Sequence, residues 1–203
     1  MLPLEEEARR GGYQLVAGLD EAGRGSLCGP VAAAAVILDL NGDLEGIKDS
    51  KCLSARKREY LYHRIVKNSL CWAVGLVKAD EIDRINIKNA TVKAMKEAVY
   101  HLEKEPQLLL IDGLPLPSLS GIPQISVVKG DARCLSIAAA SIIAKVTRDR
   151  IMVELDEEYP GYCLRKNKGY GTVEHLRALR LLGASPIHRM TFDPMKSTIG
   201  TLF

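Results

Sequence analysis

Short apolar runs, separated by polar or glycine-containing turns, are the most regular feature of the chain. Residues 13–20 alternate between apolar and other positions and predict a strand, and the apolar run at 31–38 predicts its antiparallel partner. A third strand is expected at 70–77. The run at 108–111 is apolar without a break, which is typical of a strand covered on both faces, and 125–128 is expected to be another such strand.

Amphipathic segments between these runs predict helices. One basic helix is expected to begin after Ser54, whose hydroxyl suits an N-cap, and to run to about Lys67. The other expected helices span 4–10, 86–103, 134–159 and 172–182, with a helical turn at 79–84 and a basic loop at 165–171. Strands followed by alternating helices and strands indicate an α/β domain with a mixed sheet.

Length and composition narrow the class of protein. The chain has 203 residues, enough for one large domain with a sizeable core. Its five cysteines show no paired spacing, which favours free thiols over a disulfide framework or a zinc site. His63, His175 and His188 have no partner at ligand spacing, so no metal is assigned to them.

Neither a signal peptide nor a membrane-spanning stretch is recognisable, and we therefore expect a cytoplasmic protein. The net charge of +3 suits an ordinary solvated surface as well as a polyanionic partner.

Four carboxylates stand at or just past the ends of three predicted strands. Asp20 and Glu21 end the first strand, Asp112 closes the fourth, and Asp131 follows the fifth. Sites in open α/β sheets gather at strand ends. Oxygen ligands without His or Cys favour Mg²⁺ or Mn²⁺, and four carboxylates suit two ions that flank a phosphodiester. Adjacent strand residues point to opposite faces, so we expect the strand to end or bulge between Asp20 and Glu21.

Each acid also has a purely structural interpretation. Asp112 and the glycine after it form a common turn signal. Asp131 suits the N-cap of the next predicted helix. Asp20 and Glu21 suit a solvated strand end, although the preceding apolar run disfavours this. The hypothesis of a metal site therefore depends on the coincidence of all the positions.

Other residues suit contacts with a phosphate or a sugar. Gly23-Arg24-Gly25 offers backbone N–H groups beside a cation, and Tyr170 presents a ring between two glycines. The alternatives are a tight turn and a loop aromatic packed on the core. The candidates for phosphate contacts, which otherwise lie on solvated helix faces, are Lys51, Lys145 and Arg148.

Seven short motifs occur in a fixed order along the chain. They are Gly18-Leu-Asp-Glu-Ala-Gly-Arg-Gly25, Asp49-Ser-Lys51, Ile111-Asp-Gly113, Lys129-Gly-Asp131, Ala139-Ala-Ser-Ile-Ile-Ala-Lys-Val-Thr-Arg-Asp-Arg150, Lys168-Gly-Tyr170 and Pro186-Ile-His-Arg189. With these motifs the chain resembles the type 2 ribonuclease H family (ribonuclease HII) along nearly its whole length. Ser26 and Cys28 depart from the family pattern, which usually has apolar or small residues there.

The resemblance implies a fold and an activity. The implied fold is a ribonuclease H-like mixed five-stranded sheet flanked by helices, with a catalytic domain at 1–160 and a small helical C-terminal segment at 161–203 that completes the substrate groove. The implied enzyme uses Mg²⁺ or Mn²⁺ to cut the RNA strand of RNA–DNA hybrids. It also cuts 5′ of a single ribonucleotide in duplex DNA and leaves 3′-hydroxyl and 5′-phosphate ends.

The resemblance also assigns roles to residues. Catalysis and metal binding fall to the four acids, Asp20, Glu21, Asp112 and Asp131. The backbone of Gly23, Arg24 and Gly25 is expected to sense the 2′-hydroxyl, which distinguishes RNA from DNA. Tyr170 is expected to stack on the sugar of the deoxynucleotide that follows the ribonucleotide.

Two other functions stay open from the sequence: another nuclease or strand-transfer enzyme on the same fold, and a hybrid-binding module without catalysis. The acids disfavour the second, because a phosphate binder would not place them where the phosphate must sit. Ile199, Leu202 and Phe203 have the spacing of tail peptides that dock sliding clamps, although Lys196 replaces the usual Gln. The alternative is a tail folded onto its own domain. We expect a monomer.

Overall fold

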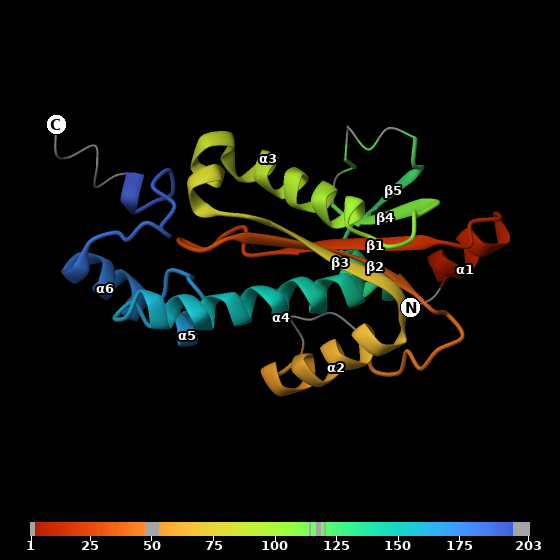
Figure 1. The fold of residues 1–203 in the computed structure, drawn as a ribbon, viewed down its shortest axis with the longest axis horizontal. Coiled ribbons are helices and arrows are strands. Elements are labelled where there is room, and N and C mark those ends of the chain that lie inside the picture. The colour runs from red at the N-terminus through yellow and green to blue at the C-terminus, as the bar shows by residue number, and fades with distance from the viewer. Residues whose placement is uncertain (1–2, 48–52, 114, 117–118, 120, 197–203) are drawn as a thin grey trace.

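One mixed sheet, with helices on both faces, organises the computed structural model, which describes residues 3–47, 53–113, 115–116, 119 and 121–196 (Figure 1). The strands are β1 (Val16–Ala22), β2 (Val31–Leu38), β3 (Ser69–Val77), β4 (Leu108–Asp112) and β5 (Gln124–Val127). Their order in the sheet is β3-β2-β1-β4-β5. β1 pairs antiparallel with β2 and parallel with β4, so the predicted mixed sheet is confirmed.

The helices lie close to the predicted positions. They are α1 (Pro3–Arg10), α2 (Ala55–Asn68), α3 (Ala79–Tyr100), α4 (Leu135–Glu158), α5 (Leu164–Asn167) and α6 (Val173–Leu182), with a 3₁₀ turn η2 (Gly130–Ala132) before α4. The predicted N-cap of α2 is confirmed, because the Ser54 hydroxyl accepts from the Lys57 N–H at 3.3 Å. Thr172 caps α6 in the same way through the His175 N–H. None of the described helices is long and apolar enough to cross a membrane.

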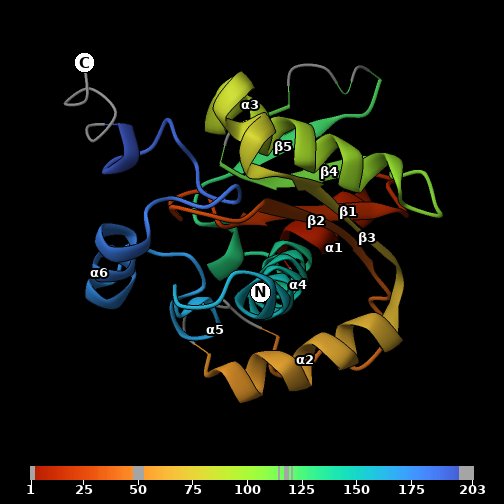
Figure 2. The ribbon, with the colours of Figure 1, turned by 60° about the vertical axis from the view of Figure 1, so that its left-hand side comes forward.

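The two faces of the sheet bury separate cores (Figure 2). α3 covers one face, against alternate residues of β2 that include Ala33 and Ala35. α4 and α2 cover the other face, against Ala34 and Val36. Every residue of β2 is consequently buried, as an apolar strand sandwiched between two helix layers must be.

At Gly18 the backbone of α4 comes unusually close to β1. A Cβ on this residue would lie 2.1 Å from the carbonyl carbon of Ser136. The absence of a side chain therefore permits this close approach of α4 to β1. Asp20, two residues further along the same face of β1, is thereby brought against α4.

Three details differ from or refine the prediction. α3 is interrupted at Asn86 (φ 65°, ψ 163°), whose side chain accepts from the Asn89 N–H, so the predicted division into a turn and a longer helix is confirmed. β5 was expected to be covered on both faces, but it is the edge strand and Ile125 is 43% exposed. The short helix α5 lies at the start of the expected basic loop. It forms because the N–H groups of Asn167 and Lys168 donate to the carbonyls of Cys163 and Leu164, four residues earlier.

Candidate active site

Three of the four predicted acids meet at one end of the sheet. Asp20 of β1, Asp112 at the end of β4 and Asp131 of η2 each place a carboxylate oxygen within 4.8 Å of the others. They meet because β4 pairs in parallel with both β1 and β5, which brings the carboxyl ends of the three strands to the same end of the sheet. The Gly130 N–H donates to Asp112 Oδ1 at 2.8 Å and fixes the turn that carries Asp131.

The electrostatics of this cluster suit a cation. Burial, reinforced by the charges of Glu21 and Asp112, raises the pKa of Asp20 from 3.8 to about 8. A hydrogen bond from Ser141 opposes this shift only in part. A buried group of carboxylates is costly without positive charge, and an all-oxygen donor set is the one that Mg²⁺ and Mn²⁺ prefer. The residues present therefore fit a divalent ion.

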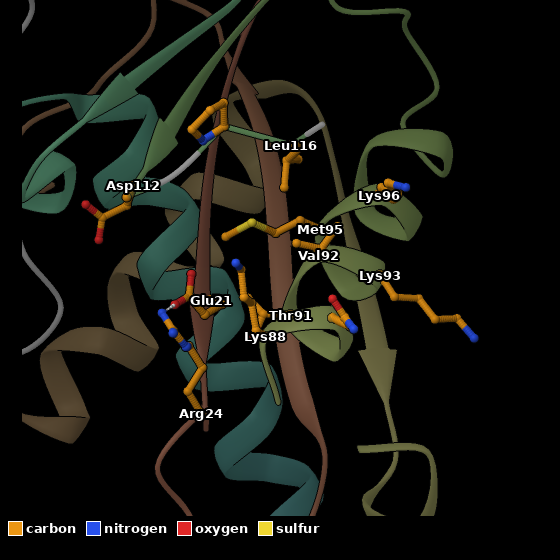
Figure 3. Close-up of a pocket in the computed structure, with 13 residues that line it drawn as sticks. Glu21, Arg24, Lys88, Thr91, Val92, Lys93, Met95, Lys96, Asp112 and Leu116 are labelled. Atoms are coloured by element: carbon orange, nitrogen blue, oxygen red, sulfur yellow. Dashed lines mark hydrogen bonds and ion pairs between the residues drawn. The ribbon is translucent and has the colours of Figure 1, made fainter. Parts of the chain in front are cut away.

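Glu21 does not join this cluster, because it leaves β1 on the opposite face. Asp20 and Glu21 pair in unbroken register with Ala34 and Ala33, so the expected strand end or bulge between the two acids is wrong. The strand continues to Ala22. Figure 3 shows Glu21 facing Arg24, whose guanidinium Nη1 lies 3.0 Å from Glu21 Oε1.

A cleft of about 810 Å³ opens beside the acids on the α3 side of the sheet. Glu21 and Asp112 line it together with Lys88 from α3. Figure 3 shows Lys88 extending toward Glu21, whereas Lys93 and Lys96 extend away from it. The sequence did not single out Lys88, since one lysine on a helix carries no signal of its own. The cleft offers a polyanion cationic groups directly beside the carboxylates.

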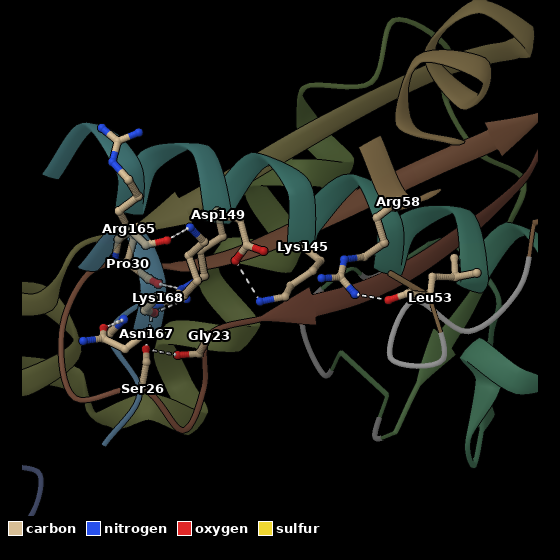
Figure 4. Close-up of polar contacts among 12 residues, drawn as sticks. Gly23, Ser26, Pro30, Leu53, Arg58, Lys145, Asp149, Arg165, Asn167 and Lys168 are labelled. Carbon is tan, nitrogen blue, oxygen red and sulfur yellow. Dashed lines mark hydrogen bonds and ion pairs between the residues drawn. The ribbon is translucent and has the colours of Figure 1, made fainter. Parts of the chain in front are cut away.

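The two glycines of the Gly23-Arg24-Gly25 corner have different surroundings. Gly23 is buried at φ +89°, and a Cβ there would lie 2.0 Å from Arg148 Nε. Gly25 is exposed, and a Cβ there would meet no atom within 4 Å. The Ser26 hydroxyl donates to the Gly23 carbonyl at 2.9 Å and closes the corner, as Figure 4 shows. Only Gly25 and the exposed Arg24 therefore present the corner to a ligand.

Arg148 is completely buried, so its predicted phosphate contact is wrong. Its guanidinium donates to the Ser26 hydroxyl at 2.7 Å and to the carbonyls of Pro30 at 2.8 Å, Lys168 at 2.9 Å and Cys28 at 3.1 Å. The rigid fork of an arginine suits such multiple contacts. Arg148 fastens the corner to the loop that carries Tyr170.

The other predicted contact residues lie nearer the surface. Lys145 forms an ion pair with Asp149 at 2.7 Å (Figure 4), and its Nζ lies 5.6 Å from the centre of the Tyr170 ring. Tyr170 is 37% exposed, so its ring is not packed into the core. Lys51 lies outside the described residues.

Sequence reasoning missed a buried group that the fold assembles from distant segments. Cys28, His175 and His188 place their side-chain donor atoms within 4.8 Å of one another. Arg189 is also completely buried and donates to the Arg24 carbonyl at 2.9 Å. The only sequence signal was the motif that ends at Arg189, because spacing cannot reveal a contact between residues nearly 150 positions apart.

Comparison with known proteins agrees with this geometry. A family model described as Ribonuclease HII matches residues 17–195. A ribonuclease HII of Enterococcus faecalis is 53% identical over 199 residues, covering 98% of this chain and 77% of that protein. One of Dehalococcoides mccartyi is 53% identical over 201 residues, covering 98% of this chain and 94% of that protein.

Two solved structures share the fold. The ribonuclease H2 of Pyrococcus horikoshii has a TM-score of 0.78 at 28% identity, covering 92% of this chain and 97% of that one. The ribonuclease HII of Archaeoglobus fulgidus, solved in a complex with PCNA, has a TM-score of 0.77 at 27% identity, covering 88% and 95%. The ribonuclease H-like fold is therefore confirmed, and the chain belongs to the ribonuclease HII family of endonucleases that hydrolyse RNA in RNA–DNA hybrids.

Proposed function

We propose that this enzyme also cuts 5′ of a single ribonucleotide in duplex DNA and leaves 3′-hydroxyl and 5′-phosphate ends by a two-metal mechanism. The observation that carries the proposal is the buried cluster of Asp20, Asp112 and Asp131 beside a cleft with cationic groups. Sites that transfer or hydrolyse phosphodiesters use such carboxylates to hold two divalent ions.

The acids and the corner have separate tasks in this proposal. Asp20, Asp112 and Asp131 hold Mg²⁺ or Mn²⁺, and Glu21 is the fourth ligand. A pair of divalent ions held by these residues would supply the chemistry of a two-metal site, which activates a water for attack and stabilises the departing 3′-oxygen. Glu21 leaves β1 on the opposite face and is paired with Arg24, so its part in metal binding requires that pair to open and its side chain to turn toward the other acids.

Recognition of the ribonucleotide falls to the exposed side of the corner. The backbone at Gly25 has open space around it and can approach the 2′-hydroxyl. Tyr170 presents its half-exposed ring for stacking on the next sugar. Lys145 supplies positive charge beside Tyr170, and Lys88 supplies it in the cleft lined by Glu21 and Asp112.

The deciding assay uses a DNA duplex with one ribonucleotide, in Mg²⁺, in Mn²⁺ and in EDTA. We expect one metal-dependent nick on the 5′ side. The cleavage activity of Asp112→Asn should fall by more than roughly 100-fold, which is the loss typical when only a hydrogen-bond partner of a metal ligand is removed. The control is Asp43→Asn, at an exposed residue outside the cluster.

The other outcomes separate the alternatives. Cleavage in EDTA, or full activity of Asp112→Asn, would contradict the metal mechanism. Cleavage of long hybrids alone would remove only the single-ribonucleotide substrate. Binding without cleavage would favour a hybrid-binding module, and joined strands would favour a strand-transfer enzyme.

We also propose that the enzyme is a monomer and that its C-terminal residues bind a sliding clamp. Such binding would keep the enzyme at a replication site. Ile199, Leu202 and Phe203 lie outside the described residues. The support is their spacing, and the complex of the Archaeoglobus fulgidus ribonuclease HII with PCNA. Deleting Leu202 and Phe203 should abolish clamp binding in solution while cleavage persists; unchanged binding would exclude this tail.

A further inference from the structure

His175 and His188 form a buried pair whose partners define the position of each imidazole proton. The Ser185 N–H donates to His188 Nδ1 at 3.0 Å, so this nitrogen is an acceptor. The Tyr170 carbonyl lies 3.0 Å from His175 Nδ1 and can only accept, so that nitrogen carries a proton. A neutral imidazole has one proton, and His188 Nε2 is therefore the donor to His175 Nε2, 3.1 Å away.

The pair is a hydrogen-bonded unit rather than a metal site. Cys28 Sγ lies 4.0 Å from His175 Nε2, and sulfur with two imidazoles is by type a donor set for a soft metal. A metal on His188 Nε2 would move the ring proton to Nδ1, where it would face the N–H of Ser185. The existing hydrogen bonds already satisfy all four ring nitrogens. Burial also raises the pKa of the Cys28 thiol to about 12, which keeps it protonated.

The histidine pair lies between two segments that flank residues 27–29, which follow the corner and precede β2. On one side the Leu27 N–H donates to the Gly169 carbonyl at 2.7 Å. On the other side the Gly29 N–H donates to the Ile187 carbonyl, and the Arg189 N–H donates to the Leu27 carbonyl, both at 2.9 Å. His175 bonds to the segment of Gly169 and Tyr170, and His188 lies in the segment 187–189. The hydrogen bond between the two histidines joins these outer segments, so the three segments form a closed ring of contacts.

This ring holds both parts of the proposed ribonucleotide contact. The Arg189 guanidinium donates to the Arg24 carbonyl at 2.9 Å, inside the Gly-Arg-Gly corner. His175 donates to the carbonyl of Tyr170, whose ring is the proposed stacking surface. A path of contacts therefore runs from the corner to Arg189 by a hydrogen bond, along the chain to its neighbour His188, and by hydrogen bonds through His175 to the Tyr170 carbonyl.

We propose that the His175–His188 pair is a positioning unit that sets the distance between the Tyr170 ring and the corner backbone. The two contacts then engage neighbouring nucleotides in one fixed spacing. The inference rests on the proposed recognition of a ribonucleotide and deepens it. His175 and His188 are not among the acids proposed to hold the metal. The inference therefore assigns to them an effect on substrate binding and on selectivity for the ribonucleotide.

Substitutions at His175 test the pair in the full-length enzyme. His175→Leu removes the donor to the Tyr170 carbonyl, whereas His175→Asn keeps an N–H at the position of Nδ1. We expect KM for the single-ribonucleotide duplex to rise roughly 10- to 100-fold in the leucine variant, the cost of a misplaced contact, with a smaller change in kcat. The asparagine variant should recover most of the loss. His63→Leu, at an exposed position on α2, is the matched control.

A double-mutant cycle with Tyr170→Ala separates positioning from general damage to the fold. If His175 acts through Tyr170, His175→Leu should change KM less than about twofold once the ring is absent. An undiminished effect in the Tyr170→Ala background, or a wild-type KM in His175→Leu, would overturn the inference. If the leucine variant does not fold, the same cycle with His188→Asn, which removes the donor to His175 Nε2, decides.

Failure of the proposed function is distinguishable from failure of the pair. A wild-type enzyme that does not cut the single-ribonucleotide duplex would contradict the proposed function. The cycle is then read from fluorescence anisotropy of an RNA–DNA hybrid in EDTA. Coupling between His175 and Tyr170 in that binding assay would still support the pair, and independent effects would contradict it.

Discussion

Asp20 and Glu21 are neighbours in β1, yet their carboxylates leave the sheet on opposite faces. Asp20 lies against α4 and receives a hydrogen bond from Ser141, whereas Glu21 lines the cleft beside α3 and pairs with Arg24. Regular pairing with β2 requires this divergence. One acid is therefore buried with like charges and the other is accompanied by a cation.

This difference predicts how the stability of the metal-free protein depends on pH. The pKa of Asp20 is about 8 in the folded protein and 3.8 in the reference state, so the folded form holds a proton that the unfolded form has released. The free energy of unfolding should then fall as pH rises from about 4 to about 8. Thermal unfolding in EDTA at pH 5 and pH 8 measures this, and each 1 kcal/mol should shift Tm by about 2–4 °C.

Two companion measurements assign the effect to Asp20. Asp20→Asn in EDTA should lose most of the fall in Tm between pH 5 and pH 8. Mg²⁺ or Mn²⁺ should stabilise the wild type more at pH 8 than at pH 5, because the ions bind the ionised form. An equal pH dependence in wild type and Asp20→Asn would contradict the assignment.

The arrangement of the acids was predictable because each strand end carries its own local signal. A run of apolar residues followed by an acid identifies Asp112 and Asp131 without knowledge of the fold. Strand continuity past Asp20 was not predictable. It is determined by the pairing of Glu21 and Ala22 with β2, which depends on partners ten or more residues away.

Two basic residues one helical turn apart should respond differently to salt. Lys145 is partly exposed beside Tyr170, so Lys145→Gln should lower the slope of log binding constant against log salt by about 1. Arg148 is buried and binds four backbone or hydroxyl oxygens, so Arg148→Gln should leave the slope unchanged but destabilise the fold by about 3 kcal/mol or more. A lower slope in Arg148→Gln would contradict its structural role.

Arg148 shows where sequence reasoning reaches its limit. Its position seven residues after the small-residue stretch Ala138–Ser141 of α4 is compatible with a solvated helix face or a phosphate contact. Its burial comes from loops at Ser26 and Lys168 that fold over it, and neither loop has a periodicity that would indicate this. The histidine pair escaped prediction for the same reason, since tertiary packing alone brings its members together.

The glycines of the first motif should separate folding from recognition. Gly18→Ala would place a Cβ 2.1 Å from the backbone of Ser136, so we expect a loss of about 3 kcal/mol or more and a correspondingly lower Tm. The new methyl group of Gly25→Ala meets no atom within 4 Å, so its free energy of unfolding should lie within about 0.5 kcal/mol of the wild type and its Tm should be unchanged. The same variant should raise KM for the single-ribonucleotide duplex, because the new methyl group occupies the space through which the 2′-hydroxyl approaches. A Gly25→Ala enzyme with unchanged KM and unchanged selectivity would show that the open backbone at Gly25 does not contact the ribonucleotide.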